Sequence, residues 1–373
     1  MSKRLKLSVE DMSDLARGAT FLGCGGGGDP YLGRLLCENA IREHGMPEVM
    51  SLEDLADDAN VYPVAVIGAP TVMIEKLFSV EDFEIALSQL ETFTGRKADA
   101  VVSAEAGGFN GLLPIAIAAR RGIPVLNADG VGRAVPEAHM TTYNAYGVSI
   151  SPLSMTNEHG ETVVMLSRDG ISGERLARAM TIQMGLSVAM SCYPMTGAQA
   201  KRAAVPDVLS ISLGIGRSIR EGRAHGDPLT TLFDNLRNTP YHKFCSVLFE
   251  GKIADVNRET SPKGWTFAKY RLAALADQGA TVEIMVQNEN LLARRDGKLI
   301  AMVPDLIVLV DAETVEPITT ETVRHGQRVK LLGISVGEML RTPQALEWFG
   351  PRAFGLECDY MPVEEMSRAH ERR

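Results

Sequence analysis

The chain has 373 residues and a formal net charge of −9, with 45% hydrophobic and 23% charged residues. This composition is typical of a folded protein and excludes disordered and collagen-like chains. The negative charge argues against a general basic surface for nucleic acid or anionic lipid, and no uncharged run reaches the ~20 residues that span a bilayer. A chain of this length predicts two domains or one elaborated domain.

The cysteines are scattered and odd in number, which predicts a reducing compartment and excludes a disulfide scaffold or a C-x-x-C zinc motif. They are Cys24, Cys37, Cys192, Cys245 and Cys358. The basic start of the chain is not followed by an apolar segment, so we expect no signal peptide. We therefore expect a cytoplasmic protein that binds neither nucleic acid nor membrane.

A glycine-rich loop is the first conspicuous motif, Gly23-Cys-Gly-Gly-Gly-Gly-Asp-Pro30. The residues on both sides have helical spacing, with Asp29 as the expected N-cap and Pro30 as the first helical residue. Consecutive glycines are costly to order, so a folded protein keeps them for tight turns or close approach to a ligand. The N–H groups of a helix N-terminus favour an anionic or carbonyl-bearing ligand. We predict that the ligand-binding residues here are Gly25, Gly26, Gly27, Gly28 and Asp29.

The same loop satisfies the G-x-G-x-x-G spacing at Gly23, Gly25 and Gly28, but a glycine run does so almost automatically. A dinucleotide fingerprint requires a strand before the loop, whereas the preceding residues predict a helix. The lysine of a P-loop is missing as well. We therefore expect neither NAD nor ATP as a cofactor.

Cys24 lies inside this loop, close to the predicted helix N-terminus. A thiol in that position should have a lowered pKa and act as a nucleophile or a metal ligand. The alternative is a small, buried and unreactive residue.

Strands then alternate with helices. Two short apolar runs, 61–68 and 99–104, flank a helical segment at 80–94. A second helix at 111–121 and a strand at 122–126 follow directly. Continuous apolar strands separated by helices predict a parallel sheet covered on both faces.

The second half of the chain changes in character. Residues 146–166 predict a hairpin that extends the first sheet, and helices dominate from 173 to 238. From 243 to 336, β-rich runs alternate with turn signals, including the hairpin dipeptide Asp296-Gly297. The tail from 342 to 360 is expected to pack back on the first domain.

The predicted fold class is therefore α/β, with a mostly parallel sheet and flanking helices plus a smaller all-β C-terminal domain. We place the α/β N-terminal domain at residues 1–242, with a return segment at 340–373. The β-rich domain, a sandwich or barrel, is placed at residues 243–339.

Three predicted strands end in loops of glycine and polar residues, at 68–71, 105–110 and 127–133. In an open parallel sheet, ligands bind beyond the carboxyl ends of the strands. Three such loops together predict a binding crevice more strongly than one would. The expected substrate contacts in them are Thr71, Asn110, Gly130 and Arg133.

Glu105 and Asp129 should converge in this crevice if their strands are adjacent. They could bind a metal or act as general base and orienting group, or they could simply cap the following helices. Arg133 could bind a substrate carboxylate or pair with Glu137. His139 could join Asp129 in a divalent-metal site, with zinc as an example, or it could be an ordinary core residue.

Several motifs in chain order resemble signatures of the S-methyl-thiohydantoin desulfurase-like family, formerly a domain of unknown function and associated with hydantoinase and oxoprolinase proteins. They are the glycine loop, Gly68-Ala-Pro-Thr-Val72, Glu105-Ala-Gly-Gly-Phe-Asn110, Asp129-Gly-Val-Gly-Arg-Ala134, Met195-Thr-Gly-Ala-Gln199, Gln287-Asn-Glu-Asn-Leu291, Glu316-Pro-Ile-Thr-Thr-Glu321 and Gly350-Pro-Arg-Ala-Phe-Gly355. The resemblance implies an α/β N-terminal domain and a β-rich C-terminal domain.

The resemblance also implies a hydrolytic desulfurase that replaces sulfur by oxygen on a thiohydantoin-type ring. Such a reaction needs activated water, N–H donors for developing charge and a place for the departing sulfur. Glu105 or Asp129 would activate the water, directly or through a metal, and Cys24 would be a ligand or nucleophile. The alternatives are a ring-opening hydantoinase-like amidohydrolase and a non-catalytic ligand-binding subunit of a hydantoinase-type complex. The expected partners are a heterocyclic substrate, further copies of the chain and a hydantoinase-family protein.

Overall fold

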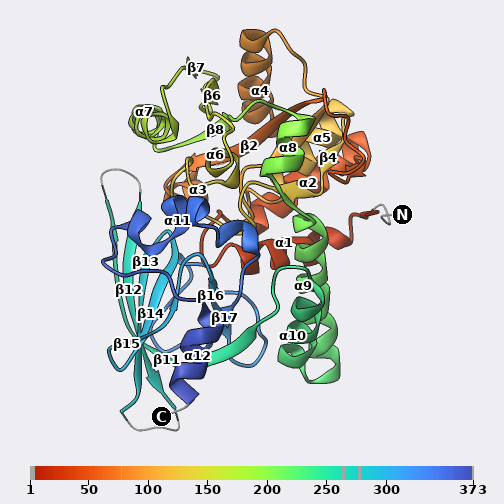
Figure 1. Cartoon of the computed structure of the whole chain (residues 1–373). Coiled ribbons are helices and arrows are strands. Elements are labelled where there is room, and N and C mark those ends of the chain that lie inside the picture. The colour runs from red at the N-terminus through yellow and green to blue at the C-terminus, as the bar shows by residue number, and fades with distance from the viewer. Residues whose placement is uncertain (1–4, 77, 262–264, 276–278, 372–373) are drawn as a thin grey trace.

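The computed structural model describes residues 5–76, 78–261, 265–275 and 279–371. Two large sheets dominate it, one in the upper half of Figure 1 and one in the lower half. Helices cover the upper sheet and separate it from the lower one (Figure 1). No helix within the described ranges is long and apolar enough to cross a membrane.

The upper sheet is half parallel and half antiparallel. The first four strands in the order below pair in parallel. From the fourth strand, β2, onward, each strand pairs antiparallel with the next. Across the sheet they are β1 (Val49–Met50), β4 (Val125–Leu126), β3 (Ala100–Ser103), β2 (Asn60–Gly68), β8 (Ser187–Ser191), β6 (Leu153–Thr156) and β7 (Thr162–Met165). The short β9 (Met195–Thr196) also pairs with β2, and β5 (Ala128–Asp129) pairs with β10 (Val205–Pro206).

Strand β8 corrects the expectation of mainly helices between 173 and 238, because it lies in the middle of the sheet beside β2. All five of its residues are buried. The run Ser-Val-Ala-Met-Ser is short, and its small residues do not separate a strand from a helix by periodicity. Only pairing with β2 and β6 decides its conformation.

Both faces of the upper sheet are covered, as predicted. One face packs against α2 (Pro30–His44), α4 (Val80–Thr94) and α5 (Leu113–Arg121) through a core that includes Phe83, Leu87 and Ile115. The other face packs against a second core that contains Tyr143 and Tyr193. The helices on that side are α6 (Thr142–Ala145), α7 (Gly170–Gln183) and α8 (Gly197–Ala203), and the short α3 (Pro70–Glu75) follows β2.

The lower sheet is entirely antiparallel, in the order β15-β14-β13-β12-β11-β17-β16. Its strands are β11 (Cys245–Thr260), β12 (Thr266–Ala274), β13 (Thr281–Gln287), β14 (Glu289–Arg295), β15 (Lys298–Met302), β16 (Leu306–Asp311) and β17 (Arg328–Ile334). The predicted hairpin at Asp296-Gly297 joins β14 to β15, and both residues have positive φ, at 48° and 81°. These angles are those of the tight turn that this dipeptide favours.

Three helices and the tail complete the structure. The pair α1 (Asp11–Leu22) and α9 (Val208–His225), with α10 (Pro228–Asn238), packs on one face of the lower sheet. The tail divides between the two halves. Its helix α11 (Pro343–Phe349) contacts α6, whereas α12 (Val363–Glu371) packs on β15 and β17. Two 3-10 turns, Glu338–Leu340 and Pro351–Phe354, flank α11.

Candidate functional site

The glycine loop lies between α1 and α2, so the predicted helix–loop–helix context is confirmed. The Asp29 side chain accepts hydrogen bonds from the N–H groups of Tyr31 (2.8 Å) and Leu32 (3.1 Å), which is the predicted N-cap. The carbonyl of Gly27 accepts from the N–H groups of Phe109 and Asn110. A Cβ added to Gly27, whose φ is +81°, would lie 2.3 Å from the Cα of Gly107. Glycine is therefore needed here because two loops touch through their backbones.

The other side of the loop is held by the lower sheet. The Cys24 carbonyl accepts from the Asn290 N–H (3.0 Å), and the Gly25 carbonyl accepts from the Thr320 N–H (2.9 Å). A Cβ added to Gly26 would lie 1.8 Å from Oε1 of Glu289. The loop thus fits between the loop at 105–110 and the lower sheet, and it brings those two regions together.

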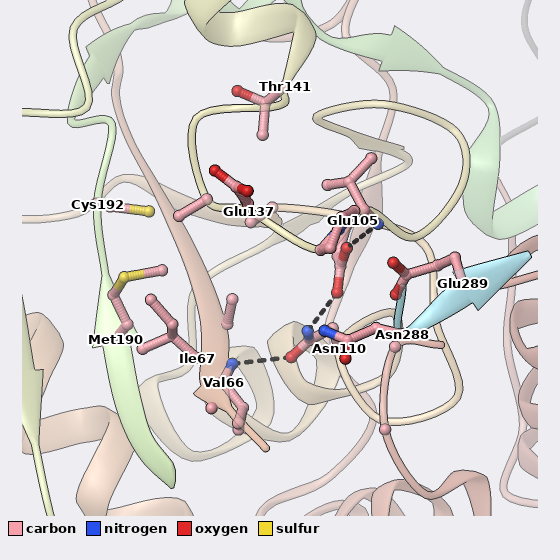
Figure 2. A pocket seen from close by; sticks show the side chains of 18 of the residues that line it. Val66, Ile67, Glu105, Asn110, Glu137, Thr141, Met190, Cys192, Asn288 and Glu289 are labelled. Atoms are coloured by element: carbon pink, nitrogen blue, oxygen red, sulfur yellow. Dashed lines mark hydrogen bonds between the residues drawn. The ribbon is translucent and has the colours of Figure 1, made fainter. Parts of the chain in front are cut away.

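A cavity of about 70 Å³ opens where these elements meet, at the carboxyl ends of β2 and β3. One buried water needs roughly 15 Å³ by the same measure, so the cavity accommodates several waters or a small ring. Figure 2 shows its lining, with Glu105 and Glu289 on one side, sulfur-containing and aliphatic side chains on the other, and Glu137 between them. The lining residues are Gly27, Gly28, Ala65, Val66, Ile67, Gly68, Met73, Ala104, Glu105, Asn110, Val135, Pro136, Glu137, Ala138, Thr141, Arg178, Met190, Cys192, Asn288 and Glu289.

Glu105 follows β3 directly and is held at both carboxyl oxygens. Oε1 accepts from Nδ2 of Asn110 (2.7 Å), and Oε2 accepts from the Val135 N–H (2.7 Å). Burial raises the pKa of Glu105 to about 7, although these donors and the positive charge of Arg133 oppose the shift. The carboxyl group therefore changes its charge near neutral pH, as a general acid–base group must.

Asn110 fixes the orientation of Glu105. Its Oδ1 accepts from the backbone N–H of Val66 on β2 (2.8 Å), so its Nδ2 must point at the carboxyl group. The amide therefore connects two neighbouring strand ends, β2 and β3, through one side chain. Such a second contact keeps an acid–base group in one orientation.

Glu289 comes from the lower sheet, at the sharp turn between β13 and β14. The turn consists of Asn288, which has a φ of +56° and pairs with Thr266 through its side chain and backbone. Glu289 is 2% exposed, and its Oε2 has no hydrogen-bond partner in the part of the chain that the structure describes. Burial and the nearby Glu105 charge raise the pKa of Glu289 well above its usual value. The protonated form of Glu289 is therefore favoured, and in that form its carboxyl group can donate a hydrogen bond into the cavity.

The segment 135–138 closes one side of the cavity, and hydrogen bonds to the buried side chains of Glu174 and Arg178 hold it in place. The Ala138 N–H donates to Oε2 of Glu174, and Oε1 of Glu174 accepts from Nε of Arg178 (2.8 Å). Arg178 also donates to the Pro136 carbonyl, as does the indole N–H of Trp265. This wall of the cavity is consequently rigid.

Cys24 does not reach the cavity. It has no exposed surface, and it lies in the core between α1 and the lower sheet. Burial raises the pKa of its thiol, so the expected lowering of this pKa is wrong. The desolvation of the thiolate outweighs the favourable charge of Arg133.

Arg133 is also buried, at 2% exposed, and its donors are used within the protein. Nη1 donates to the carbonyls of Pro304 (2.8 Å) and Asp305 (3.1 Å), and Nε donates to the carbonyl of Ala134. It pairs neither with Glu137 nor with any other carboxylate among the described ion pairs. The structure thus assigns Arg133 to holding the lower sheet against the loop at 127–133, away from the cavity lining.

Asp129 lies outside the cavity lining, although its strand end is next to that of Glu105. Its Oδ1 accepts from the N–H groups of Val131 (2.9 Å) and Gly132 (2.6 Å), which makes it the cap of a turn. Burial raises its pKa to about 7. Gly130 is needed for packing, because a Cβ there would lie 2.3 Å from the Ala104 carbonyl oxygen. Neither residue is brought to the expected crevice.

His139 packs edge-on against Trp348 and lies 3.5 Å from Glu137 through Nδ1. No group of three metal-ligating side chains occurs within the described ranges. Asp129 and His139 therefore lack a third ligand of the usual kinds. Of the remaining predicted contacts, Gly27, Gly28, Glu105 and Asn110 line the cavity, whereas Gly25, Gly26 and Asp29 do not. Thr71 lies in α3, and its side chain is outside the described part of the structure.

The comparison with known proteins identifies the family. Models of the S-Me-THD-like N-terminal domain and the S-Me-THD-like C-terminal domain match residues 10–167 and 168–363. The chain belongs to the S-Me-THD-like family. A crystal structure of a protein from Chromobacterium violaceum is also similar, with a TM-score of 0.77 and 26% sequence identity over 96% of this chain and 99% of that chain. No curated protein matches the sequence.

The cavity uses both S-Me-THD-like domains. Glu105 and Asn110 belong to the N-terminal family domain, and Glu289 and Arg178 belong to the C-terminal one. Strand β8, which supplies Met190 and is followed directly by Cys192, belongs to the C-terminal family domain but pairs within the upper sheet. The site is therefore complete only when the two domains are docked.

Sequence reasoning missed Glu289, Arg178, Cys192 and Met190 as cavity residues. A signal existed for Glu289, because Asn288-Glu-Asn290 places three polar residues between two apolar β runs. The motif by itself does not indicate a role for Glu289. No comparable signal marks Met190 or Cys192, whose position follows only from the placement of β8.

Proposed function

We propose that this S-Me-THD-like protein is a hydrolytic desulfurase that cleaves the exocyclic C–S bond of an S-methyl-thiohydantoin-type ring. The main support is the pair of buried carboxyl groups in one cavity, Glu105 and Glu289, contributed by the two family domains. Burial raises the pKa of Glu105 to about 7, and burial together with the Glu105 charge raises the pKa of Glu289 well above its usual value. Two carboxyl groups of different acidity are suited to be a base and an acid at the same pH.

In the proposed reaction, Glu105 is the general base. Its carboxylate removes a proton from a water molecule, whose oxygen forms a bond to the ring carbon that carries sulfur. The protonated Glu289 gives its proton to the adjacent ring nitrogen, which receives the electron pair of the C=N bond. The backbone of Gly27 and Gly28, which borders the cavity, supports the developing negative charge.

The tetrahedral intermediate then collapses. The C–S bond breaks, the sulfur takes the proton held by Glu105 and leaves as methanethiol, and the new hydroxyl returns its proton to Glu289. The products are a hydantoin and methanethiol, so one water is consumed and both carboxyl groups regain their starting states.

This scheme predicts a bell-shaped pH dependence. Glu105 must be ionised, so kcat/KM rises as the pH increases through about 7. Glu289 must stay protonated, so kcat/KM falls again as the pH passes the raised pKa of Glu289. A rate that is independent of pH between 5 and 9 would contradict the scheme.

The decisive test is product analysis of the purified protein with an S-methyl-thiohydantoin. Release of methanethiol and formation of the hydantoin are expected in equal amounts. A ring-opened acid with no thiol would favour the hydantoinase-like alternative, which could use the same acid–base pair. Binding without any turnover, seen as a thermal shift, would favour a ligand-binding subunit.

A divalent metal is a separate proposal. Elemental analysis of unchelated wild-type protein and of Asp129→Ala tests it, because a metal held by Asp129 and His139 would be lost in the variant. Equal metal content in both proteins would remove Asp129 from any metal site.

We further propose a cytoplasmic location, which is supported by the free state of all five cysteines. Self-association is supported by exposed apolar side chains such as Leu166 (64%) and Ile171 (59%). Light scattering of the purified protein tests it, and a monomer at micromolar concentration would contradict it. Co-purification of a hydantoinase-family protein would test the proposed partner.

A further inference from the structure

The wall of the cavity opposite the carboxyl groups is built from two adjacent strands of the upper sheet. Ala65 on β2 is the cross-strand partner of Met190 on β8, and Cys192 lies two residues further along the chain. Residues two apart in an extended chain project from the same face. Ile67 and Cys192 also line the cavity, and all four residues are at most 5% exposed.

This wall differs chemically from the rest of the cavity. Figure 2 shows Met190, Cys192 and Ile67 on one side and Glu105, Asn110 and Glu289 on the other, with the carboxyl group of Glu137 between them, nearer to Cys192. Ala65 is a small residue opposite the long side chain of Met190, which leaves space beside the thioether. Thioether and thiol sulfur are polarizable and adapt to apolar groups.

The thiol of Cys192 stays uncharged, because burial raises its pKa to about 12. The side chains of Ala65, Ile67, Met190 and Cys192 therefore offer dispersion contacts and carry no charge of their own, although the carboxyl group of Glu137 lies beside them. A carboxylate or hydrated oxo group placed there would lose its water without gaining a strong hydrogen bond. An uncharged alkyl sulfide loses little on leaving water.

We infer that Ala65, Ile67, Met190 and Cys192 form a subsite for the alkylthio substituent of the substrate, facing the carboxyl groups that bind the ring. This inference rests on the proposed function, since it orients the same ring in the same cavity. The ring edge that carries nitrogen faces Glu105 and Glu289, and the methylthio group points toward β8. The subsite thus determines which ring carbon is presented to the water.

The test compares binding of two rings that differ only in the substituent, 2-(methylthio)imidazole and imidazole, by calorimetry at pH 8. Wild-type protein should bind the methylthio ring roughly 10-fold more tightly, the discrimination typical of a small group in an apolar pocket. Met190→Gln should lower that ratio at least ~5-fold, because it places an amide in the wall. Cys192→Ser is the second variant and should lower it in the same direction.

Met195→Gln is the matched control. Met195 is buried in the same core on β9, pairs with Val61 at the end of β2 away from the cavity, and does not line the cavity. It should cost stability as Met190→Gln does and leave the binding ratio unchanged. Melting temperatures confirm that each variant is folded before binding is measured.

The outcomes separate this inference from the proposed function. A wild-type ratio near one, or a ratio that neither Met190→Gln nor Cys192→Ser changes, overturns the subsite even if methanethiol is released from the thiohydantoin. A fall in the preference for the methylthio ring in Met190→Gln and Cys192→Ser, but not in the control variant, supports the subsite. If that loss occurs and wild-type protein releases no methanethiol, the subsite stands and the hydrolytic function is overturned. Binding of neither ring overturns the subsite.

Discussion

Two buried carboxyl groups of this protein, those of Glu105 and Asp129, have similar pKa values and different surroundings. Glu105 and Asp129 follow neighbouring strands, and burial raises the pKa of each to about 7. Glu105 lines a cavity and is held by a side-chain amide, whereas Asp129 caps a turn and lies outside that cavity. A shifted pKa alone therefore does not identify a reactive group, because burial shifts the pKa of structural and functional carboxyl groups alike.

Access distinguishes the two. The free oxygen of Asp129, Oδ2, lies buried without a hydrogen-bond partner among the described residues, and the turn that it caps contributes no residue to the cavity that contains Glu105. Glu289 also has an unpartnered oxygen, but it faces the cavity that contains Glu105. An unsatisfied buried oxygen costs free energy, and only in the second case does a ligand have room to satisfy it.

The largest effect should come from Glu105→Gln. It keeps the size of the side chain and removes the base, so kcat/KM should fall roughly 10³-fold, within the range typical of a lost general base. Stopped assays of methanethiol release measure this effect. Retention of wild-type turnover would remove Glu105 from the reaction.

Asp129→Asn sharpens the comparison through stability. The folded-state pKa of Asp129 exceeds its unfolded value, so wild-type protein binds an extra proton between about pH 4 and 7 and loses stability as the pH rises through this window. The asparagine does not titrate. The free energy of unfolding of the variant minus that of wild type should therefore be about 3 kcal/mol larger at pH 8 than at pH 4.

Denaturant titration at both pH values measures this gain. Turnover of Asp129→Asn should stay within about 3-fold of wild type, because a turn cap is not a reacting group. A rate as low as that of Glu105→Gln would instead place Asp129 in the reaction and break the distinction.

Glu289→Gln should lower kcat/KM roughly 10²-fold, since the amide can still donate a hydrogen bond but cannot transfer a proton. The fall in rate at high pH should disappear with it, because that limb belongs to the raised pKa of Glu289. A pH–rate profile of the variant checks both effects. Persistence of the high-pH limb would assign it to another group.

A smaller loss of kcat/KM than in Glu289→Gln should come from Gly26→Ala. The added Cβ would lie 1.8 Å from Oε1 of Glu289, so the carboxyl group must move. We expect kcat/KM to fall about 10-fold through misplacement of an acid–base group. Gly95→Ala is the control, because its added Cβ meets nothing within 4 Å, although its φ of +69° costs stability. Equal rates for the two variants would show that the position of Glu289 does not matter.

The sequence by itself determined the local elements whose signals are short-range. The boundaries of α4, the Asp29 cap of α2 and the Asp296-Gly297 hairpin all follow from capping and turn chemistry within a few residues. The sequence also correctly predicted that the cavity lies at the carboxyl ends of β2 and β3, where Glu105 and Asn110 line it. These predictions succeeded because a strand end points its following loop to one edge of a sheet.

Only the tertiary structure decided what is exposed at that edge. Cys24, Asp129 and Arg133 looked reactive in the sequence. In the structure the Cys24 thiol is desolvated, Asp129 accepts from the N–H groups of its own turn, and Arg133 donates to carbonyl groups of a distant segment. Conversely, Glu289 and Met190 reach the cavity through the docking of the lower sheet and through the central place of β8. The acidity and access of a side chain depend on long-range packing, which capping and periodicity do not encode.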